Sequence, residues 1–314
     1  MRTNAATAED LRSTPARTRA RRGARPLARI QPRRTPSRPP AAVPASPFLK
    51  WAGGKGRLLP PLLPLLPPAV ERRLHIEPFM GGAALFFHRR PKRAVLADLN
   101  RDLVETYLAV RDEPEALIEA LRPLAAEHDQ ARYYERRQRY NEGRGLRRVE
   151  RAALFVYLNK TCFNGLHRVN RKGEFNVPFG RYKNPRVLDA EGIRRASAAL
   201  QGVDIRCEGF EQVLRYARPG DFVYFDPPYL PVSETANFTS YAREGFGPAE
   251  HERLRDVFAE LDRRGCKVML SNSDAPLVRA LYRGYRIERV AAARAISCNG
   301  RGRGAVTELV VLNY

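Results

Sequence analysis

Apolar runs rich in β-branched and aromatic residues recur along the chain, and turn-forming or charged residues separate them. Such runs predict buried strands, here at residues 74–79, 93–97, 203–208, 222–225, 267–270, 285–290 and 307–312. Between some of these runs the apolar spacing is helical, and residues 248–261 place Leu254, Val257, Phe258 and Leu261 on one helix face. The pattern predicts an α/β fold, which binds its ligands at the carboxyl ends of the strands.

Residues 105–202 have a different pattern. Helical apolar spacing occurs at 115–128 and 149–158, and basic residues crowd 132–151. The polar stretch 159–182 predicts a β-hairpin bearing asparagine, arginine and an aromatic side chain, types that read base edges and stack on bases. A solvated charged face around a core phenylalanine is the alternative. We expect an inserted, mainly helical domain at 105–202, and a catalytic domain formed by 47–104 and 203–314.

The first 46 residues form an arginine-rich arm. It contains eleven arginines against Glu9 and Asp10, with many proline, alanine, serine and threonine residues. This composition cannot build a core and predicts disorder. The arm has no apolar stretch typical of a secretory signal. Its composition favours the interpretation that this segment adds non-specific DNA affinity, with an organellar transit peptide as the alternative.

The formal net charge of the chain is +22. Such an excess favours a polyanionic partner, because lysine and arginine gain affinity by releasing counterions from phosphates. A genomic bias toward arginine is the alternative, although exchanging lysine for arginine adds no charge. The charge therefore favours nucleic acid as the partner.

Cysteine and hydropathy patterns limit the remaining classes. The four cysteines, Cys162, Cys207, Cys266 and Cys298, are far apart and form no C-x-x-C pair, so neither a metal site nor a disulfide framework is expected. Reduced thiols are typical of a cytoplasmic protein. No apolar run approaches the roughly 20 residues that a membrane-spanning helix needs.

Residues 74–98 resemble half of a dinucleotide-binding βαβ unit. A Gly81-Gly82 turn follows the first strand, and Asp98 ends the second, near the spacing at which an acid binds ribose hydroxyls. The G-x-G-x-x-G pattern is missing, which favours a nucleoside-like cofactor without phosphates, S-adenosylmethionine, over a dinucleotide. A purely structural α/β unit is the alternative. The earlier Gly53-Gly54-Lys55 lacks the rest of a phosphate-binding P-loop and predicts a glycine turn.

The stretch Asp226-Pro227-Pro228-Tyr229 follows the apolar run 222–225, at the carboxyl end of a predicted strand. The Asp226 carboxylate and the Pro227 carbonyl can accept the two N–H bonds of an adenine amino group, and Tyr229 can stack on the base. A methyl group could then move in line from a sulfonium about 3–3.5 Å away. The alternative is an Asp-Pro turn that ends the strand.

The target amino group is buried in a DNA duplex, so the base must be extruded at a cost of a few kcal/mol. A side chain must also fill the gap that the base leaves. An aromatic residue of the predicted hairpin, such as Phe163, is suited to this role.

Four motifs in one order resemble the DNA adenine methylase (Dam-type) family of site-specific N6-adenine methyltransferases. They are Lys50-Trp51-Ala52-Gly53-Gly54-Lys55, Glu77-Pro78-Phe79-Met80-Gly81-Gly82, Leu96-Ala97-Asp98-Leu99-Asn100 and Asp226-Pro227-Pro228-Tyr229. The resemblance extends from residue 48 to 314 and includes 159–182. It implies a Rossmann-like class-I S-adenosylmethionine-dependent methyltransferase sheet with an inserted, mainly helical target-recognition domain.

The resemblance also implies residue roles. For the cofactor site it assigns Trp51 and Lys55 to the lining, Phe79 to the cofactor adenine, Asp98 to the ribose and Asp226 to the space between cofactor and target base. For the DNA it assigns Phe163 to the wedge, Asn164 to the orphan thymine, Arg168 to a guanine, and Leu166 and Pro178 to a thymine methyl, which together imply a GATC site. Phe163 stands where tyrosine is common, and His167 departs from the family pattern.

We therefore expect a DNA (adenine-N6)-methyltransferase that transfers a methyl group from S-adenosylmethionine to a flipped adenine in double-stranded GATC. A monomer in the bacterial cytoplasm, without metal or membrane, is expected. Three alternatives stay open: methylation of another nitrogen, namely cytosine N4 or a protein amide; methylation of an RNA adenine; and a DNA-binding protein whose catalytic site is idle.

Overall fold

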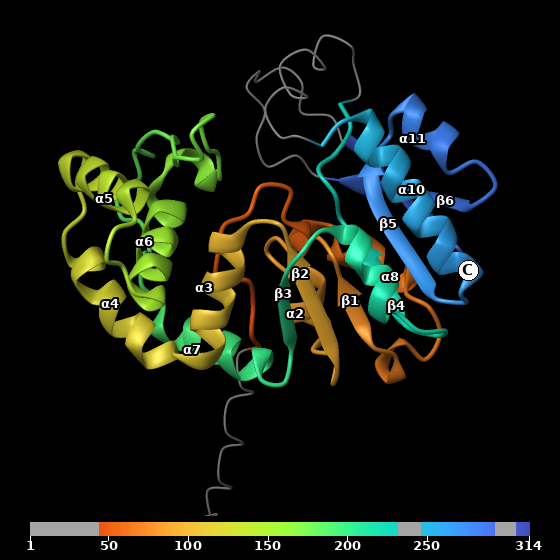
Figure 1. Ribbon diagram of the computed structural model, residues 1–314, viewed down its shortest axis with the longest axis horizontal. Coiled ribbons are helices and arrows are strands. Elements are labelled where there is room, and N and C mark those ends of the chain that lie inside the picture. The colour runs from red at the N-terminus through yellow and green to blue at the C-terminus, as the bar shows by residue number, and fades with distance from the viewer. Residues whose placement is uncertain (1–43, 232–245, 293–305) are drawn as a thin grey trace, which may run out of the picture. The chain divides into compact units, whose positions relative to one another are not determined.

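The computed structural model describes residues 44–231, 246–292 and 306–314 (Figure 1). Residues 1–43 of the arm that we expect to be disordered therefore lie outside the described residues. None of the helices in the described ranges is long and apolar enough to cross a membrane.

Seven strands of the described residues form one mixed sheet in the order β3-β2-β1-β4-β5-β7-β6. The first five strands along the chain are parallel to one another: β1 (His75–Glu77), β2 (Ala94–Asp98), β3 (Asp204–Cys207), β4 (Phe222–Phe225) and β5 (Lys267–Ser273). Strand β7 (Val306–Leu312) is antiparallel to both β5 and β6 (Arg286–Ala292). The sheet confirms the expected α/β class, with helices on its faces.

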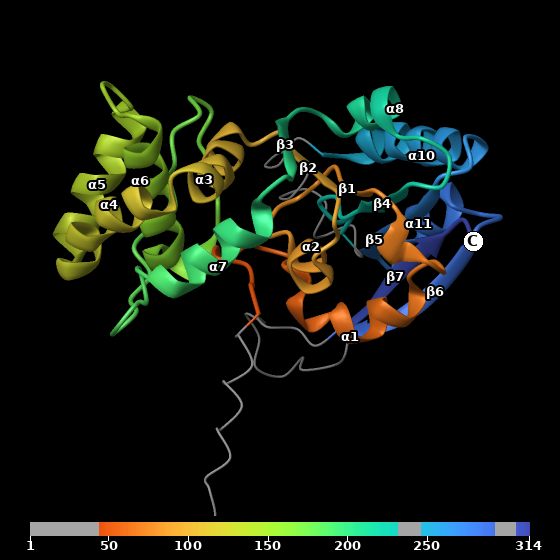
Figure 2. The same cartoon turned by 90° about the horizontal axis from the view of Figure 1, so that it is seen from below.

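The period-two alternation of strand residues decides which helices cover each face. Val223 and Phe225 of β4 pack with α8 (Val213–Tyr216), α10 (Pro248–Arg263) and α11 (Pro276–Leu281). Phe222 and Tyr224 point to the other face, where they share a cluster with residues of α1 (Leu59–Leu62) and α2 (Ala84–Arg89). Figure 2 shows α8 and α10 on one side of the sheet and α1 and α2 on the other.

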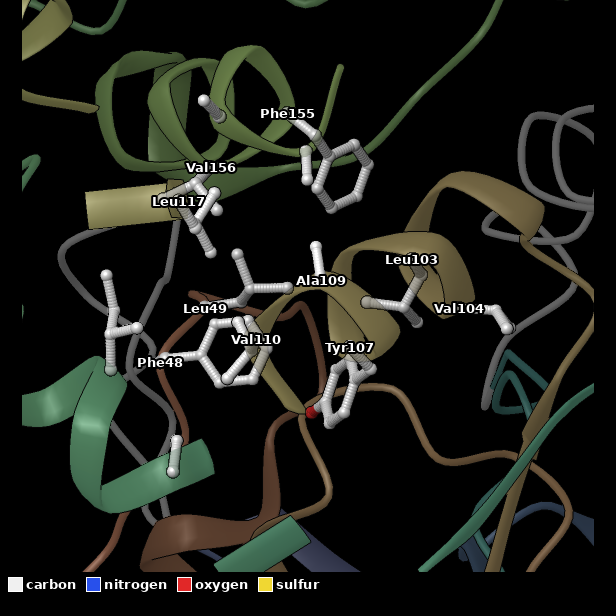
Figure 3. Packing of buried hydrophobic residues seen from close by; sticks show 14 of the residues in the cluster. Phe48, Leu49, Leu103, Val104, Tyr107, Ala109, Val110, Leu117, Phe155 and Val156 are labelled. Carbon is white, nitrogen blue, oxygen red and sulfur yellow. The ribbon is translucent and has the colours of Figure 1, made fainter. Parts of the chain in front are cut away.

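A group of helices follows β2 along the chain. It consists of α3 (Arg101–Asp112), α4 (Pro114–Ala126), α5 (Gln130–Glu142), α6 (Arg148–Thr161) and, further on, α7 (Ala190–Leu200). One hydrophobic cluster runs from α2 and β2 through α3 into α4, α5, α6 and α7. Figure 3 shows side chains of α3 facing Leu117 of α4 and Phe155 and Val156 of α6. The proposed domain limits at 105 and 202 thus fall within a shared core and stay a prediction.

The N-terminal segment of the described chain crosses this core. Phe48 and Leu49 are buried in the cluster beside α3, where the Phe48 ring lies 4.7 Å from that of Tyr107, centroid to centroid (Figure 3). Burying such side chains contributes about 1.5–3 kcal/mol each. The segment is therefore held firmly just before Lys50 and Trp51.

The hairpin predicted at 159–182 is only partly formed. Two isolated antiparallel bridges, Cys162 with Phe179 and Val169 with Phe175, replace a continuous ladder. A 3-10 turn, η4 (Phe163–Gly165), interrupts the first arm, with Asn164 in the left-handed region at φ 55°. The positive φ takes Asn164 out of the extended conformation that a ladder requires.

An ion pair joins α3 to the helices that follow it. Arg151 of α6 donates from Nε to Asp102 Oδ1 at 2.6 Å and from Nη2 to Oδ2 at 2.9 Å, and the Tyr140 hydroxyl of α5 also donates to Asp102. Burial favours the protonated carboxyl, but these hydrogen bonds outweigh it and hold the pKa of Asp102 below its usual value.

Replacing Asp102 with alanine should lower the free energy of unfolding by about 1–3 kcal/mol, because Arg151 and Tyr140 lose a partly buried acceptor. Urea unfolding followed by circular dichroism measures this change. The control Glu119→Ala removes an exposed pair with Arg122 and should cost less than about 1 kcal/mol. An Asp102→Ala effect no larger than that of the control would contradict the role given to this pair.

Candidate active site

The tetrapeptide Asp226 to Tyr229 begins directly after β4, at the carboxyl edge of the parallel strands. Strand β4 lies between β1 and β5, so the ends of those two strands flank the tetrapeptide. Asp98 ends β2, which is two strands from β4, or ~10 Å at the usual strand spacing. The acids at 98 and 226, which the sequence predicted to share an edge, do so.

Lys55 reaches the tetrapeptide from the 3-10 turn η1 (Lys55–Arg57). Its Nζ lies 2.5 Å from Asp226 Oδ1, and the two side chains are 5% and 20% exposed. Nζ also donates to the Gly53 carbonyl at 2.7 Å and lies 4.5 Å from the centroid of the Tyr229 ring. The predicted glycine turn is present, with Gly53 at φ +76°, and it directs Lys55 toward Asp226.

Burial raises the pKa of the Asp226 carboxyl to about 6, and the Lys55 ammonium limits the rise. The ammonium pairs with Oδ1 at close range. Apart from this ion pair, Oδ1 has no hydrogen-bond partner among the described residues. A buried acceptor of this kind is suited to a ligand that brings its own N–H group.

The predicted cofactor residues Trp51 and Asp98 meet through Gly81. The Gly81 N–H donates to Asp98 Oδ2 at 3.2 Å, and the Asn100 N–H donates to Oδ1 at 2.9 Å. Burial raises the pKa of Asp98, against the effect of these backbone donors. Gly81 has φ +44°, and a Cβ there would lie 2.8 Å from the Trp51 ring, so this close approach requires glycine.

Phe79, the remaining predicted cofactor residue, belongs to an aromatic cluster. Its ring stacks on Phe210 at 5.4 Å between centroids and meets Phe225 and Phe246 edge-on at 6.3 and 5.6 Å. Phe225 immediately precedes Asp226, so the cluster connects Phe79 to the tetrapeptide. The exposed part of Phe79 offers an apolar face at the same edge as Asp98.

The predicted DNA-contacting residues lie on the 162–179 loop. Phe163 is 51% exposed, and its backbone N–H donates to the Pro178 carbonyl at 2.9 Å, which places Phe163, Asn164 and Pro178 together. Leu166 packs partly against the helical core. Arg168 donates from Nε to Asn176 Oδ1 at 2.7 Å, so the orientation of its guanidinium is set before any ligand binds.

The structure also shows contacts between the predicted cofactor residues and the predicted DNA-contacting loop, which the sequence did not predict. The Asn159 side chain forms hydrogen bonds with the backbone N–H and C=O of Lys50, at 2.8 and 2.5 Å. The His167 ring stacks on Trp51 at 5.8 Å between centroids. The only sequence signals were the lysine at position 50 in an arginine-rich chain and the unusual histidine at 167.

Residues behind the tetrapeptide were also missed. Asn272 Oδ1 accepts from the Leu230 N–H at 3.2 Å, and Ser273 Oγ donates to the Leu230 carbonyl at 2.5 Å. The Tyr229 hydroxyl donates to Glu308 Oε2 at 2.7 Å. Asn272 and Ser273 end β5, and Glu308 is on β7, so only the strand pairing reveals these contacts.

Two expectations concern metals and thiols. In the described ranges, His, Cys, Asp and Glu side chains form no group of three or more that could hold a metal ion. Cys162 and Cys266 are buried and Cys207 is exposed, all as free thiols, and Cys298 lies outside the described residues.

Comparison with known proteins decides the family. Residues 51–296 match the D12 class of N6 adenine-specific DNA methyltransferases. The chain belongs to this family. It is 45% identical over 273 residues to the type II methyltransferase M1.LlaDCHI of Lactococcus lactis, an alignment that covers 85% of this chain and 95% of the relative. It is 38% identical over 267 residues to the DNA adenine methylase of Escherichia coli K12, with 84% and 94% covered.

The type II methyltransferase M.MjaIII of Methanocaldococcus jannaschii is also similar, with 41% identity over 286 residues, 86% of this chain and 99% of the relative. The expected enzyme class, a DNA adenine N6-methyltransferase, is thereby confirmed. The geometry above gives this D12 methyltransferase a buried acid–lysine pair at the sheet edge where the family motifs meet.

The titration of Asp226 tests this geometry directly. In the protein without ligands its carboxyl should titrate near pH 6, and Lys55→Met should raise its pKa further because the ammonium no longer opposes burial. Carbon-13 NMR of aspartate-labelled protein measures both values, and Asp226→Asn identifies the resonance.

The control Lys92→Met removes an exposed lysine before β2, at the opposite edge of the sheet, and should leave the titration unchanged. An Asp226 carboxyl that titrates near the ordinary value of about 3.9 would contradict the buried pair.

Proposed function

We propose that this D12 methyltransferase methylates the adenine N6 of double-stranded GATC, with S-adenosylmethionine as the methyl donor. The observation that carries the proposal is the buried Asp226–Lys55 pair, which shares a sheet edge with Asp98 and Trp51. The Asp226 carboxylate and the Tyr229 ring lie on either side of the same ammonium contact there.

Asp226 and Pro227 would orient the target amino group. The adenine amino nitrogen is a weak nucleophile because its lone pair is delocalised into the ring. The Asp226 carboxylate accepts one N–H and the Pro227 carbonyl accepts the other, which favours a more tetrahedral nitrogen and stabilises the positive charge that develops on it. Tyr229 stacks on the base and fixes its plane.

The transfer needs no covalent intermediate with the protein. The bond from the methyl carbon to adenine N6 forms as the bond from that carbon to sulfur breaks, and the methylated nitrogen then loses one proton to solvent. The role of the protein is to align the reacting atoms and to supply acceptors matched to the charge that develops on nitrogen.

The residues at the sheet edge fit a nucleoside cofactor. Asp98 is a partly buried acid oriented by the Gly81 and Asn100 amides, and its oxygens can accept from ribose hydroxyls. Trp51 packs on Gly81, whose amide donates to this acid, and Phe79 offers a second aromatic ring at the same sheet edge. Lys55 and Asp226 close the site toward the target base. S-adenosylmethionine would supply an electrophilic methyl group when bound.

We place base recognition in residues 105–202 and catalysis in 47–104 and 203–314. Phe163, exposed on a tight turn, is suited to enter the duplex in place of the flipped adenine, with Asn164 beside the orphan thymine. The oriented Arg168 guanidinium can bind guanine O6 and N7. Leu166 and Pro178 supply apolar surface for a thymine methyl, as GATC requires.

Incubating the protein with labelled S-adenosylmethionine and duplexes that contain GATC or its single-base variants tests the proposal. N6-methyladenine should appear at GATC, and Asp226→Ala should lower kcat by about a hundredfold or more. Trp51 is the chain's single tryptophan, so its fluorescence reports cofactor binding to wild type and variant alike.

Three outcomes would contradict different parts of the proposal. Cofactor binding without any N6-methyladenine, on any of the duplexes, would contradict the catalytic role. Methylation at a sequence other than GATC would contradict only the recognition assignment. A variant that loses DNA affinity but keeps turnover would contradict the role of Asp226.

Arg168→Ala should lower discrimination at its guanine by about 1–3 kcal/mol. Competition between GATC and a duplex changed at that guanine measures the ratio of kcat/KM values. Arg171→Ala, an exposed neighbour in the same loop, is the matched control and should leave the ratio unchanged. An equal loss on every duplex after Arg168→Ala would make this residue a phosphate contact.

A further inference from the structure

Glu308 reaches the catalytic tetrapeptide because β7 is antiparallel to its neighbour. Strand β7 pairs with β5, and Ser273 at the end of β5 lies opposite Glu308 near the start of β7. The early residues of an antiparallel strand lie at the edge where its neighbour ends. A residue far along the chain from Asp226 therefore stands at the same edge as Asp226.

The contact with Tyr229 is specific. The Tyr229 hydroxyl donates to Glu308 Oε2 at 2.7 Å, within the usual range for a charge-assisted hydrogen bond. Burial raises the pKa of the Tyr229 hydroxyl, so the group stays protonated and donates. Lys55 Nζ, which pairs with Asp226, lies over the same ring at 4.5 Å from its centroid. Tyr229 is thus fixed at its hydroxyl and contacted at its ring.

We propose that Glu308 is a positioning residue for methyl transfer, which holds the Tyr229 ring in the plane that stacks on the target base and keeps a negative charge beside Asp226. The inference rests on the proposed function and deepens it. Glu308 contacts no reacting atom and acts through Tyr229 and Asp226. Losing the hydrogen bond would free the Tyr229 ring to rotate, and small misplacements at a reacting centre are costly.

Several groups face Asp226 from the elements around it. Lys55 of η1 favours the ionised carboxylate, whereas Glu308 of β7 and Glu77 of β1 favour its protonation. The Glu77 carboxylate is bound to His75 at 2.6 Å, and the Tyr224 hydroxyl is bound to Ser271 Oγ at 2.8 Å. Removing the charge of Glu308 therefore lowers the pKa of Asp226 and extends its ionised range to lower pH.

Two substitutions separate the hydrogen bond from the charge. Glu308→Gln keeps an oxygen that can accept from Tyr229 but removes the charge. The acid limb of kcat/KM, measured with subsaturating DNA and cofactor, should move to lower pH, while kcat at pH 8 stays within about threefold of wild type. Glu308→Ala removes both features, so kcat at pH 8 should fall by about tenfold to a hundredfold, with little change in KM for the cofactor.

Tyr229→Phe gives an independent measure of the hydrogen bond. It removes the donor and keeps the ring, so adding Glu308→Ala to Tyr229→Phe should lower kcat less than Glu308→Ala does alone. Glu288→Gln is the matched control. Glu288 lies on β6, pairs with Arg286 at 2.8 Å and is exposed to solvent, so its loss should move neither kcat nor the acid limb.

The outcomes distinguish this inference from the proposed function. Wild-type protein that makes no N6-methyladenine overturns the proposed function. A second set of results overturns only the role of Glu308. In it, the wild-type protein methylates DNA, the acid limb of Glu308→Gln is unmoved, and the kcat of Glu308→Ala is within twofold of wild type. Thermal unfolding of each variant identifies any loss of fold, and the isosteric glutamine variant keeps the test decisive if the alanine variant fails to fold.

Discussion

The contact between Lys55 and Asp226 is the interaction on which the site depends. A carboxylate that is largely removed from water would be protonated near neutral pH without a cation beside it. The parallel pairing of β4 with β1 and β5 places Asp226 at the sheet edge, and a glycine turn near the start of the described chain supplies the ammonium. The sheet therefore sets the position of Asp226, and the Lys55 ammonium on the glycine turn favours the ionised form of its carboxyl group.

One short segment, residues 48–55, connects all the parts. Phe48 and Leu49 anchor it in the core that α3 shares with α4 and α6 (Figure 3). The backbone of Lys50 is bound to Asn159 at the end of α6, and Trp51 packs between Gly81 and the His167 ring. Lys55 then reaches Asp226. A displacement of this segment would reach Trp51, the 162–179 loop and Asp226 together, which are parts of the proposed cofactor, recognition and catalytic sites.

The fold class and the position of the tetrapeptide could be predicted from the sequence because both depend on local patterns. The run 222–225 alternates between two buried faces, and the proline pair that follows ends it. Asp98 at the end of β2 could be predicted in the same way. Family motifs supplied the enzyme class, which the comparisons confirm. The roles of Phe163, Arg168 and the other predicted site residues remain predictions. In the structure, Phe163 is exposed and Arg168 is oriented by its hydrogen bond to Asn176.

Other contacts could not be predicted because they depend on long-range register. Glu308 meets Tyr229 only because β7 enters the sheet antiparallel beside β5, and no local pattern indicates that pairing. The hairpin prediction failed in part because the left-handed Asn164 breaks the strand. The stacking of His167 on Trp51 joins two distant segments, and the unusual histidine at 167 did not by itself indicate which residue it would contact.

The pH dependence of single-turnover methyl transfer, compared between wild type and Asp226→Asn, tests the central claim most directly. Asparagine keeps an oxygen acceptor but has no carboxyl proton to gain. The account predicts that transfer by wild type falls in acid as Asp226 becomes protonated, and that the slower transfer by Asp226→Asn lacks this fall. The same acid limb in both proteins would show that another group titrates and would contradict the claim that Asp226 is the working acceptor.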